Sequence, residues 1–207
     1  MNQDLVTHWQ NIYIAKQPTE LSWFQAQAET SLQLIESARL TADAQIIDVG
    51  GGASVLVDHL LMQGFEHITV LDLAETALQR SQQRLGVNAD QVNWLVANVL
   101  DVNFSAAQFD LWHDRAVFHF LIKEQDRQQY LAQVLHALKS GAYLAISTFA
   151  EDGALKCSGL DVQRYSPQQL IDFFGSIEFD VIHQGKALHM TPAGNQQKFS
   201  YVLLQKK

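Results

Sequence analysis

Three glycines and two aspartates are the residues whose types and spacing point most directly to chemistry. Asp48 ends a short apolar run, and Gly50, Gly51 and Gly52 follow it. Glycines permit a sharp turn through positive φ and let a ligand approach the backbone, because they lack a Cβ. Asp72 ends a second apolar run 22 positions after Gly50, where an acid suits the hydroxyls of a ribose. The two signals together indicate a nucleotide-like ligand.

Asn98 follows the next apolar run. An amide at this place is suited to hydrogen-bond the edge of an adenine, and Asp101 is the second choice for that contact. Ordinary loop capping explains either residue equally well. The sequence leaves both interpretations open.

Several polar residues gather where a fourth strand is predicted to end. Ligands of open α/β sheets bind outside the carboxyl ends of the strands, so His113, Asp114, Arg115 and His119 are expected near the site. His119 is the first candidate for a general base or a substrate contact, and its alternative is a hydrogen-bonded histidine in the pocket wall. His113 is interpreted as structural. Arg115 has three candidate partners: Asp110, Asp114 or a substrate carboxylate.

A second group of candidates lies far from the glycines in the sequence. Cys157 is either a reactive thiol in a lid or a small residue packed in its loop, and the second interpretation is preferred. Large aromatic residues near the N-terminus are interpreted as core or lid packing, or as the lining of a pocket. The candidates for the pocket rim are Tyr13, Trp23, Arg164, Tyr165 and His189.

Alternating strand and helix patterns position these residues. Strands are predicted over 46–49, 67–73, 92–96, 109–114 and 142–149, and a terminal hairpin over 178–189 and 197–204. Helices are predicted over 2–15, 28–38, 74–85 and 123–138, after the glycines, and from the capping residue Ser166 onward. Five strand–helix units in succession predict a doubly wound α/β fold.

The composition narrows the classes of protein. The formal net charge of −8 argues against nucleic acid or an anionic membrane as a partner. One cysteine allows neither a disulfide nor a cysteine-based zinc site within the chain, and no metal site is predicted. No apolar run approaches the roughly 20 residues of a membrane span, and the first residues lack the basic region of a signal peptide. A soluble cytoplasmic protein is expected.

The sequence resembles the class I S-adenosylmethionine-dependent methyltransferases over roughly residues 40–150. The flanking segments resemble one bacterial branch of this family, which is distantly similar to protein-lysine methyltransferases and to small-molecule thiol and metalloid methyltransferases. The segments that carry the resemblance are 22–25 (SWFQ), 48–52 (DVGGG), 71–74 (LDLA), 97–101 (ANVLD), 113–120 (HDRAVFHF) and 157–160 (CSGL).

The resemblance implies a Rossmann-like sheet of seven strands, mostly parallel with an antiparallel last strand, and helices on both faces. Residues 1–40 would form a helical lid segment and residues 41–207 the methyltransferase domain. Asp48 and the three glycines would hold the methionine portion of the cofactor, and Asp72 the ribose. The remaining cofactor contacts that it implies are Leu73, Asn98 and Val99 at the adenine, and Asp114 and Ala116 near the sulfonium.

The predicted function is methyl transfer from S-adenosylmethionine to a small molecule, by direct in-line attack. Such an enzyme mainly aligns the nucleophile and excludes water, and it needs a base only for a protonated acceptor. The alternatives are a protein-lysine methyltransferase, a non-catalytic cofactor-binding protein and an NAD-dependent oxidoreductase. The last fits poorly, because Val55 stands where a dinucleotide fingerprint requires a third glycine.

Overall fold

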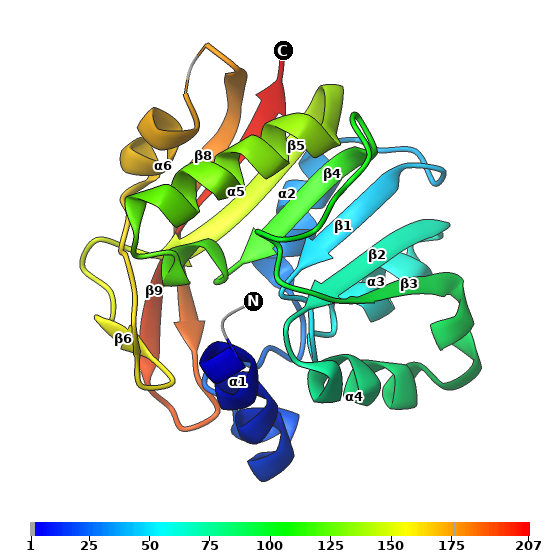
Figure 1. Ribbon diagram of the computed structural model, residues 1–207, viewed down its shortest axis with the longest axis vertical. Coiled ribbons are helices and arrows are strands. Elements are labelled where there is room, and N and C mark those ends of the chain that lie inside the picture. Colours follow the sequence, from blue (N-terminus) through cyan, green and yellow to red (C-terminus); the bar gives the residue numbers. More distant parts are fainter. Residues whose placement is uncertain (1–2, 176) are drawn as a thin grey trace.

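A seven-stranded sheet forms the centre of the molecule in a computed structural model that describes residues 3–175 and 177–207 (Figure 1). The strand order is β3-β2-β1-β4-β5-β9-β8. The strands β1 to β5 are parallel, and β9 runs antiparallel to both β5 and β8. The bounds are Gln45–Val49 (β1), His67–Asp72 (β2), Val92–Val96 (β3), Phe109–Arg115 (β4), Leu138–Phe149 (β5), Phe179–Met190 (β8) and Gln196–Lys206 (β9).

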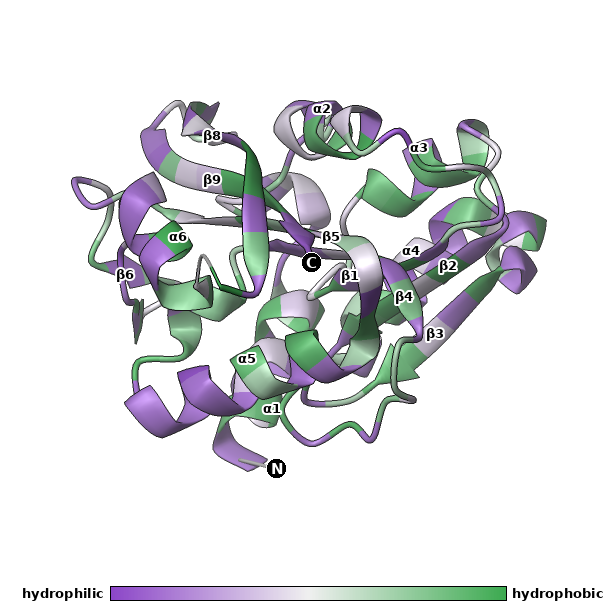
Figure 2. Cartoon of the chain, turned by 90° about the horizontal axis from the view of Figure 1, so that it is seen from above, coloured by the Kyte–Doolittle hydropathy of each residue, from purple (hydrophilic) through white to green (hydrophobic). Residues whose placement is uncertain are grey.

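Helices cover both faces of the sheet, as predicted (Figure 2). One face packs against α2, α3 and α4, and the other against α5 and α6. Alternate strand residues supply the two cores: Ile46 faces the first layer of helices and Ile47 the second. The helices are α1 Gln3–Ala15, α2 Glu29–Ser37, α3 Leu56–Met62, α4 Glu75–Leu85, α5 Glu124–Ala137 and α6 Pro167–Phe174, with 3₁₀ turns at Pro18–Glu20, Gly86–Gln91 and Phe118–Phe120.

Local sequence signals, such as helical spacing and helix caps, predict these elements correctly. In α5, the buried residues Tyr130, Val134 and Ala137 recur at helical spacing on one stripe. The helix α6 begins after Ser166, whose hydroxyl accepts a hydrogen bond from the N–H of Gln169 in a capping box. The predicted α/β class is therefore confirmed. The first residue of the predicted helix 2–15 lies outside the described residues.

Two features differ from the prediction. The strand β5 starts at Leu138 rather than at residue 142, because Leu138 already pairs with Phe109 before the register shifts. The loop that follows β5 contains a small hairpin, β6 Lys156–Cys157 and β7 Leu160–Asp161. Its turn residues Ser158 and Gly159 both have positive φ, as a two-residue type I′ turn requires.

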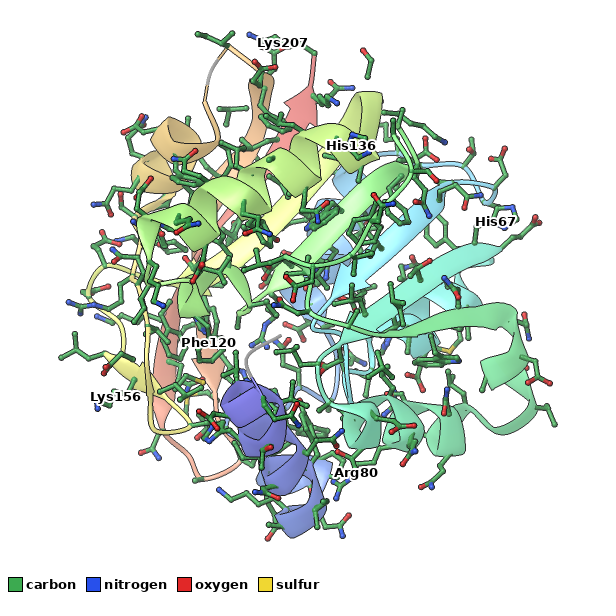
Figure 3. The ribbon with its side chains drawn as sticks, in the orientation of Figure 1. His67, Arg80, Phe120, His136, Lys156 and Lys207 are labelled. Atoms are coloured by element: carbon green, nitrogen blue, oxygen red, sulfur yellow. The ribbon has the colours of Figure 1, made fainter. Side chains whose placement is uncertain are left out.

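The N-terminal segment lies across the carboxyl ends of the central strands (Figure 1). In α1, Tyr13 and its neighbour Trp9 pack with Trp23 and with Ala77 of α4 in a separate apolar cluster. Trp9 also meets Phe120 edge to face, with ring centroids 5.2 Å apart, beside α1 (Figure 3). Aromatic side chains thus connect the N-terminal segment to the end of β4.

In the part of the chain that the structure describes, no helix has the length and apolar character needed to cross a membrane.

Candidate functional site

A cleft of ≈ 850 Å³, which includes space open to solvent, lies at the carboxyl ends of β1, β2 and β4. Two groups of residues line it. The first group follows β2, β3 and β4 and includes Asp72, Leu73, Asn98, Val99, Ala116 and Val117. The second group is a cluster of side chains in contact with one another, here called the aromatic end, and includes Trp9, Tyr13, Trp23, Phe120 and Cys157.

The glycines let the loop after β1 fit closely against the protein's own side chains. A Cβ on Gly50, where φ is +70°, would lie 2.0 Å from Cγ2 of Val117. On Gly52, with φ of +29°, it would lie 2.5 Å from Oδ2 of Asp72. Any side chain at these positions would displace the wall of the cleft or its carboxylate.

The carboxylate of Asp72 is held at the end of β2. Its Oδ1 accepts a hydrogen bond of 2.8 Å from the N–H of Ala74. Burial raises the pKa of Asp72 to about 7; the N–H of Ala74 partly offsets this rise, and the negative charge of Asp48 adds to it. Asp72 is thus half-ionised near neutral pH, and a ligand that donates hydrogen bonds to it favours the ionised form.

Asn98 lines the same end of the cleft, but its side chain already has partners. Its Oδ1 accepts a hydrogen bond from the N–H of Leu100, and its Nδ2 donates one to Asp101 over 3.1 Å. The loop-capping interpretation therefore describes its side-chain contacts. The amide has a second N–H, so contact with an adenine does not require loss of the bond to Asp101.

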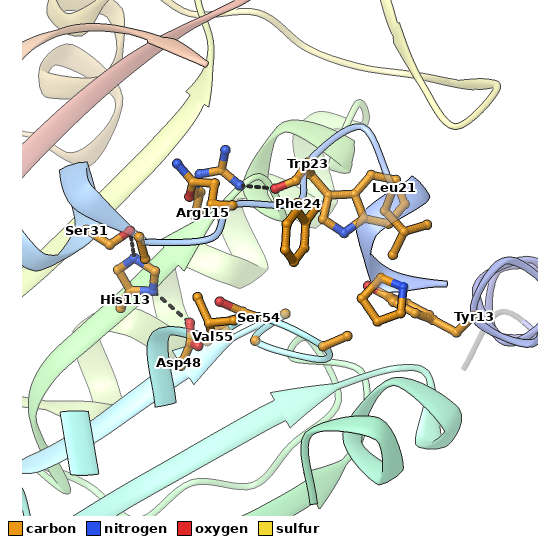
Figure 4. Close-up of a pocket in the computed structure, with 17 residues that line it drawn as sticks. Tyr13, Leu21, Trp23, Phe24, Ser31, Asp48, Ser54, Val55, His113 and Arg115 are labelled. Atoms are coloured by element: carbon orange, nitrogen blue, oxygen red, sulfur yellow. Dashed lines mark hydrogen bonds and ion pairs between the residues drawn. The ribbon is translucent and has the colours of Figure 1, made fainter. Parts of the chain in front are cut away.

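A second cavity of ≈ 600 Å³ adjoins the first and shares Tyr13, Trp23, Gly50 and Arg115 with it. Asp48 lines this cavity rather than the first. Its Oδ1 lies 2.7 Å from Nδ1 of His113, whose Nε2 lies 2.8 Å from the hydroxyl of Ser31 in α2 (Figure 4). The expectation that His113 is structural agrees with this buried position.

Tyr13 and Cys157 stay protonated at neutral pH. Burial raises the pKa of the Tyr13 hydroxyl, and the charge of Asp72 raises it further. Burial also raises the pKa of the Cys157 thiol to about 11. Neither group therefore serves as a base in the aromatic end of the cleft, and the thiol does not have the lowered pKa of a reactive cysteine.

Asp114 does not lie in the wall of either cavity, contrary to expectation. The pleat of β4 turns alternate side chains to opposite faces, so His113 meets α2 and Asp114 meets α5. The carboxylate accepts hydrogen bonds from the Tyr130 hydroxyl and from the N–H groups of Val117 and Phe118. Its role is to hold the turn that follows β4.

His119 also lies outside both cavities. Its side chain is fully buried between Phe120 and Phe149, and its Nδ1 accepts a 3.3 Å hydrogen bond from the N–H of Phe149. Burial, with a contribution from Arg115, lowers the pKa of His119 to about 3. A neutral, buried imidazole without access to the cleft does not suit the base that the sequence suggested.

Arg164 and Tyr165 were expected at the pocket rim, and neither lines the cavities. Arg164 donates a hydrogen bond to the carbonyl of Gly153, and the ring of Tyr165 packs against Phe118 on the α5 side of the sheet. His189 lines a third, open hollow together with Phe24 and Met190, and its Nε2 is 2.8 Å from the carbonyl oxygen of Ser22. Tyr13, Trp23 and Arg115, in contrast, lie in the cleft as predicted.

Sequence reasoning missed several cleft residues. The 3₁₀ turn after β4 brings Val117, Phe120 and Leu121 to the cleft, and the aromatic run at the end of that strand was the available signal. Ala116 precedes them with φ of 72°, an uncommon value for a residue with a Cβ. Nothing in the sequence pointed to Ser31, which is 82 positions from its partner His113.

Comparison with known proteins agrees with this geometry. Residues 46–141 match a family described as a methyltransferase domain. A ubiquinone/menaquinone biosynthesis C-methyltransferase, UbiE, of Roseobacter denitrificans is 28% identical over 53% of this chain and 44% of its own length. An O-methyltransferase, rstn1, of Aspergillus nomiae is 30% identical over 50% of this chain and 45% of its own. The chain thus spans less than half the length of these relatives.

More distant similarities extend over most of the chain. A mouse protein named eEF1A lysine and N-terminal methyltransferase is 22% identical over 68% of this chain and 21% of its own length. The crystal structure of the N-methyltransferase NodS of Bradyrhizobium japonicum, in complex with S-adenosyl-L-homocysteine, has the same fold. It superposes with a TM-score of 0.71 at 13% identity, over 97% of this chain and 98% of that one. Residues 46–141 of this chain are thus similar to a methyltransferase domain, and the fold of the chain is the one seen in this methyltransferase structure.

Proposed function

We propose that this protein transfers the methyl group of S-adenosylmethionine to a small molecule held at the aromatic end of the cleft. The observation that carries the proposal is one cleft that is lined both by Asp72 and Leu73 and by the aromatic rings of Trp9 and Trp23. The first pair suits a nucleoside, and the aromatic rings suit an apolar acceptor. Ala116 and Val117, which follow β4, line the same cleft.

The residues present fit the cofactor. Asp72 offers a carboxylate for the ribose hydroxyls, and the absence of a Cβ at Gly52 leaves this carboxylate in place. Leu73, Val99 and Val117 would form the apolar walls of an adenine site. In the adjoining cavity, Oδ2 of Asp48 is buried and has no hydrogen-bond partner among the described residues, so it would accept a hydrogen bond from the amino group of the methionine portion.

When bound, the cofactor would supply an electrophilic methyl carbon for a lone pair of the acceptor, and its sulfur would keep the electron pair of the broken carbon–sulfur bond as a neutral thioether. The chain's own contribution is to bind, to orient and to exclude water. Trp9, Trp23 and Phe120 would cover the acceptor, because they join the N-terminal segment to the turn after β4. We therefore propose that the segment up to residue 40 acts as a lid.

The ionisable groups at the aromatic end favour an acceptor that arrives with a free lone pair. Among the described residues that line this end, Tyr13 and Cys157 stay protonated and Arg115 stays cationic. A protein lysine side chain arrives as an ammonium, because its usual pKa is about 10.4. A lysine acceptor would need a base to remove its proton and an acidic surface to attract the basic protein that carries it. A small-molecule acceptor is therefore preferred to a protein lysine.

The test is isothermal titration of S-adenosylmethionine, S-adenosylhomocysteine and NADH into the purified protein. Binding of the first two and not of NADH is expected, with at least about tenfold weaker binding to Asp72→Ala because the ribose loses its acceptor. Asp90→Ala removes an exposed carboxylate outside both cavities and serves as the matched control. Binding of NADH alone, or equal affinity in Asp72→Ala, would contradict the proposal.

Release of S-adenosylhomocysteine is then measured with a panel of small acids, phenols, thiols and amines, and with a lysine-rich peptide. Turnover of a small molecule and not of the peptide supports the proposed acceptor class. Turnover of the peptide alone would favour a protein-lysine methyltransferase. Binding of the cofactor without any turnover would favour a non-catalytic cofactor-binding protein.

A further inference from the structure

Arg115 brings a positive charge into the cleft without an acidic partner of its own. Its Nη1 donates a 3.2 Å hydrogen bond to the carbonyl of Trp23 (Figure 4). Its guanidinium carbon lies 4.7 Å from the ring centroid of Phe199. Its Nη2 is shielded from solvent and has no hydrogen-bond partner among the described residues. Arg115 lines both cavities, so the side chain with this free donor belongs to the walls of both.

The two acidic residues that the sequence suggested as partners of Arg115 form hydrogen bonds with other residues. Asp110 pairs with Lys139 over 2.6 Å and accepts the N–H of Gln45. Asp114 is held by Tyr130 on the opposite face of the sheet. Asp48 attracts Arg115 only at longer range: no ion pair joins them in the described structure, and its Oδ1 is taken by His113.

A buried guanidinium without a counter-charge lowers the stability of a fold, because its lost hydration is not replaced. The chain has 22 acidic and 14 basic residues, so acids are not scarce. The missing partner is therefore more easily explained by a ligand than by the fold.

The groups that act electrostatically on Arg115, or respond to it, are Asp48, Cys157, His119 and His189. His119 accepts the N–H of Phe149 at Nδ1 and lies outside both cavities. Nε2 of His189 lies 2.8 Å from the carbonyl oxygen of Ser22. Cys157, a protonated thiol, lines the cleft together with Arg115. A ligand beside Arg115 in the cleft thus meets a guanidinium and a thiol, and both donate hydrogen bonds.

We propose that Arg115 binds a carboxylate of the methyl acceptor, whose apolar body packs against the cluster of Trp9, Trp23 and Phe120. This inference rests on the proposed function, because it specifies the substrate class of the same cleft. A planar guanidinium with a free N–H suits a carboxylate, which accepts hydrogen bonds at both oxygens. The acceptor would thus be a small, largely apolar acid. The methionine portion of the cofactor also has a carboxylate, and the test separates the two sources.

The experiment first titrates S-adenosylhomocysteine into the protein and then titrates matched acid and amide probes into the complex. The pairs are phenylacetate with phenylacetamide, and indole-3-acetate with indole-3-acetamide. The unsubstituted protein is expected to bind at least one acid about tenfold or more tightly than its amide, and Arg115→Met to lose this preference. Arg115→Lys keeps the charge and should retain part of it. Arg39→Met, which removes an exposed charge, is the matched control.

The other outcomes overturn the inference. Equal binding of acids and amides by the unsubstituted protein, or an undiminished preference of Arg115→Met for the acids, means that the cleft does not select a carboxylate through this residue. Weaker binding of S-adenosylmethionine to Arg115→Met, with unchanged binding of its decarboxylated analogue, assigns Arg115 to the cofactor instead. Failure of S-adenosylhomocysteine to bind the unsubstituted protein is a separate result, because it contradicts the proposed function itself.

Thermal melting gives a readout that does not depend on the choice of probe. If Arg115 is kept for a ligand, Arg115→Met should melt at the same temperature as the unsubstituted ligand-free protein or at a higher one. A clear fall in melting temperature would show that the fold itself needs the guanidinium, and would also overturn the inference.

Discussion

Nδ1 of His113 lies 2.7 Å from Oδ1 of Asp48, on the two neighbouring strands that form the centre of the site. The two residues are paired in the register of β1 and β4, and Ser31 extends the contact to α2. This arrangement occupies one oxygen of Asp48 and leaves Oδ2 unpartnered in a cavity wall. The histidine therefore decides which oxygen is available to a ligand.

Replacement of His113 tests this arrangement. His113→Leu leaves the buried carboxylate of Asp48 without its partner, so a loss of roughly 2–4 kcal/mol in the free energy of unfolding is expected. Ser31→Ala removes only the outer hydrogen bond and should cost about 1 kcal/mol. Urea denaturation measures both. Equal stability of His113→Leu and the unsubstituted protein would mean that Asp48 does not depend on the histidine.

The raised pKa of Asp72 predicts a pH dependence of cofactor binding. The ribose hydroxyls donate to the ionised carboxylate, so affinity for S-adenosylhomocysteine should fall as the pH drops below about 7. The fall approaches tenfold per pH unit if no other group contributes. Titrations from pH 5.5 to 8.5 measure it, and Asp72→Asn should bind weakly with no such slope. A flat profile for the unsubstituted protein would contradict the role given to Asp72.

The same shift predicts an opposite effect on stability. The pKa of Asp72 is higher in the folded protein than its ordinary value, so its contribution to stability is lost as the pH rises from about 4 to about 7. Asp72→Asn keeps an oxygen for the N–H of Ala74 but carries no charge. It should raise the melting temperature of the ligand-free protein by several degrees at pH 8 and by little at pH 5. A lower melting temperature at pH 8 would contradict this sign.

The close fit of the glycine loop predicts a specific cost of a methyl group. In Gly52→Ala, the new Cβ would press on the carboxylate of Asp72, so affinity for S-adenosylhomocysteine should fall by about tenfold or more. Gly64→Ala is the matched control, because Gly64 also has positive φ but its Cβ would meet nothing within 4 Å. The control should lose about 1 kcal/mol of stability and keep its affinity. Similar affinities in the two variants would show that Gly52 is needed only for its backbone conformation.

Tyr130→Phe tests the structural role of Asp114. The Tyr130 hydroxyl donates to Asp114 and accepts from the indole N–H of Trp112, and both bonds are buried. Their loss should cost roughly 2–3 kcal/mol of stability with little change in cofactor affinity. The partly exposed Tyr143, which accepts one bond from Gln205, gives the control Tyr143→Phe. A large loss of cofactor affinity in Tyr130→Phe would indicate that Asp114 contributes to the cofactor site.

Local patterns were sufficient to predict most elements of the fold. The apolar periods, the capping residue Ser166 and the glycine turns act over a few residues, so they are visible without tertiary contacts. The same holds for the end of β2: Asp72 had to lie at the carboxyl edge of the sheet because the strand pattern stops there. The small hairpin at Cys157 was missed, although its Ser158-Gly159 turn was readable.

By itself, the sequence determined the doubly wound class, the glycine loop, the acid after β2 and the aromatic N-terminal segment that meets them. Only the tertiary structure decided the partners of the polar residues after β4. Successive side chains of a strand alternate in direction, so it was the packing of α2 and α5 on opposite faces that gave His113 to Ser31 and Asp114 to Tyr130. That packing also left Arg115, at the end of the strand, without an acidic ion-pair partner among the described residues. No local pattern contains this information, because each contact joins segments far apart in the chain.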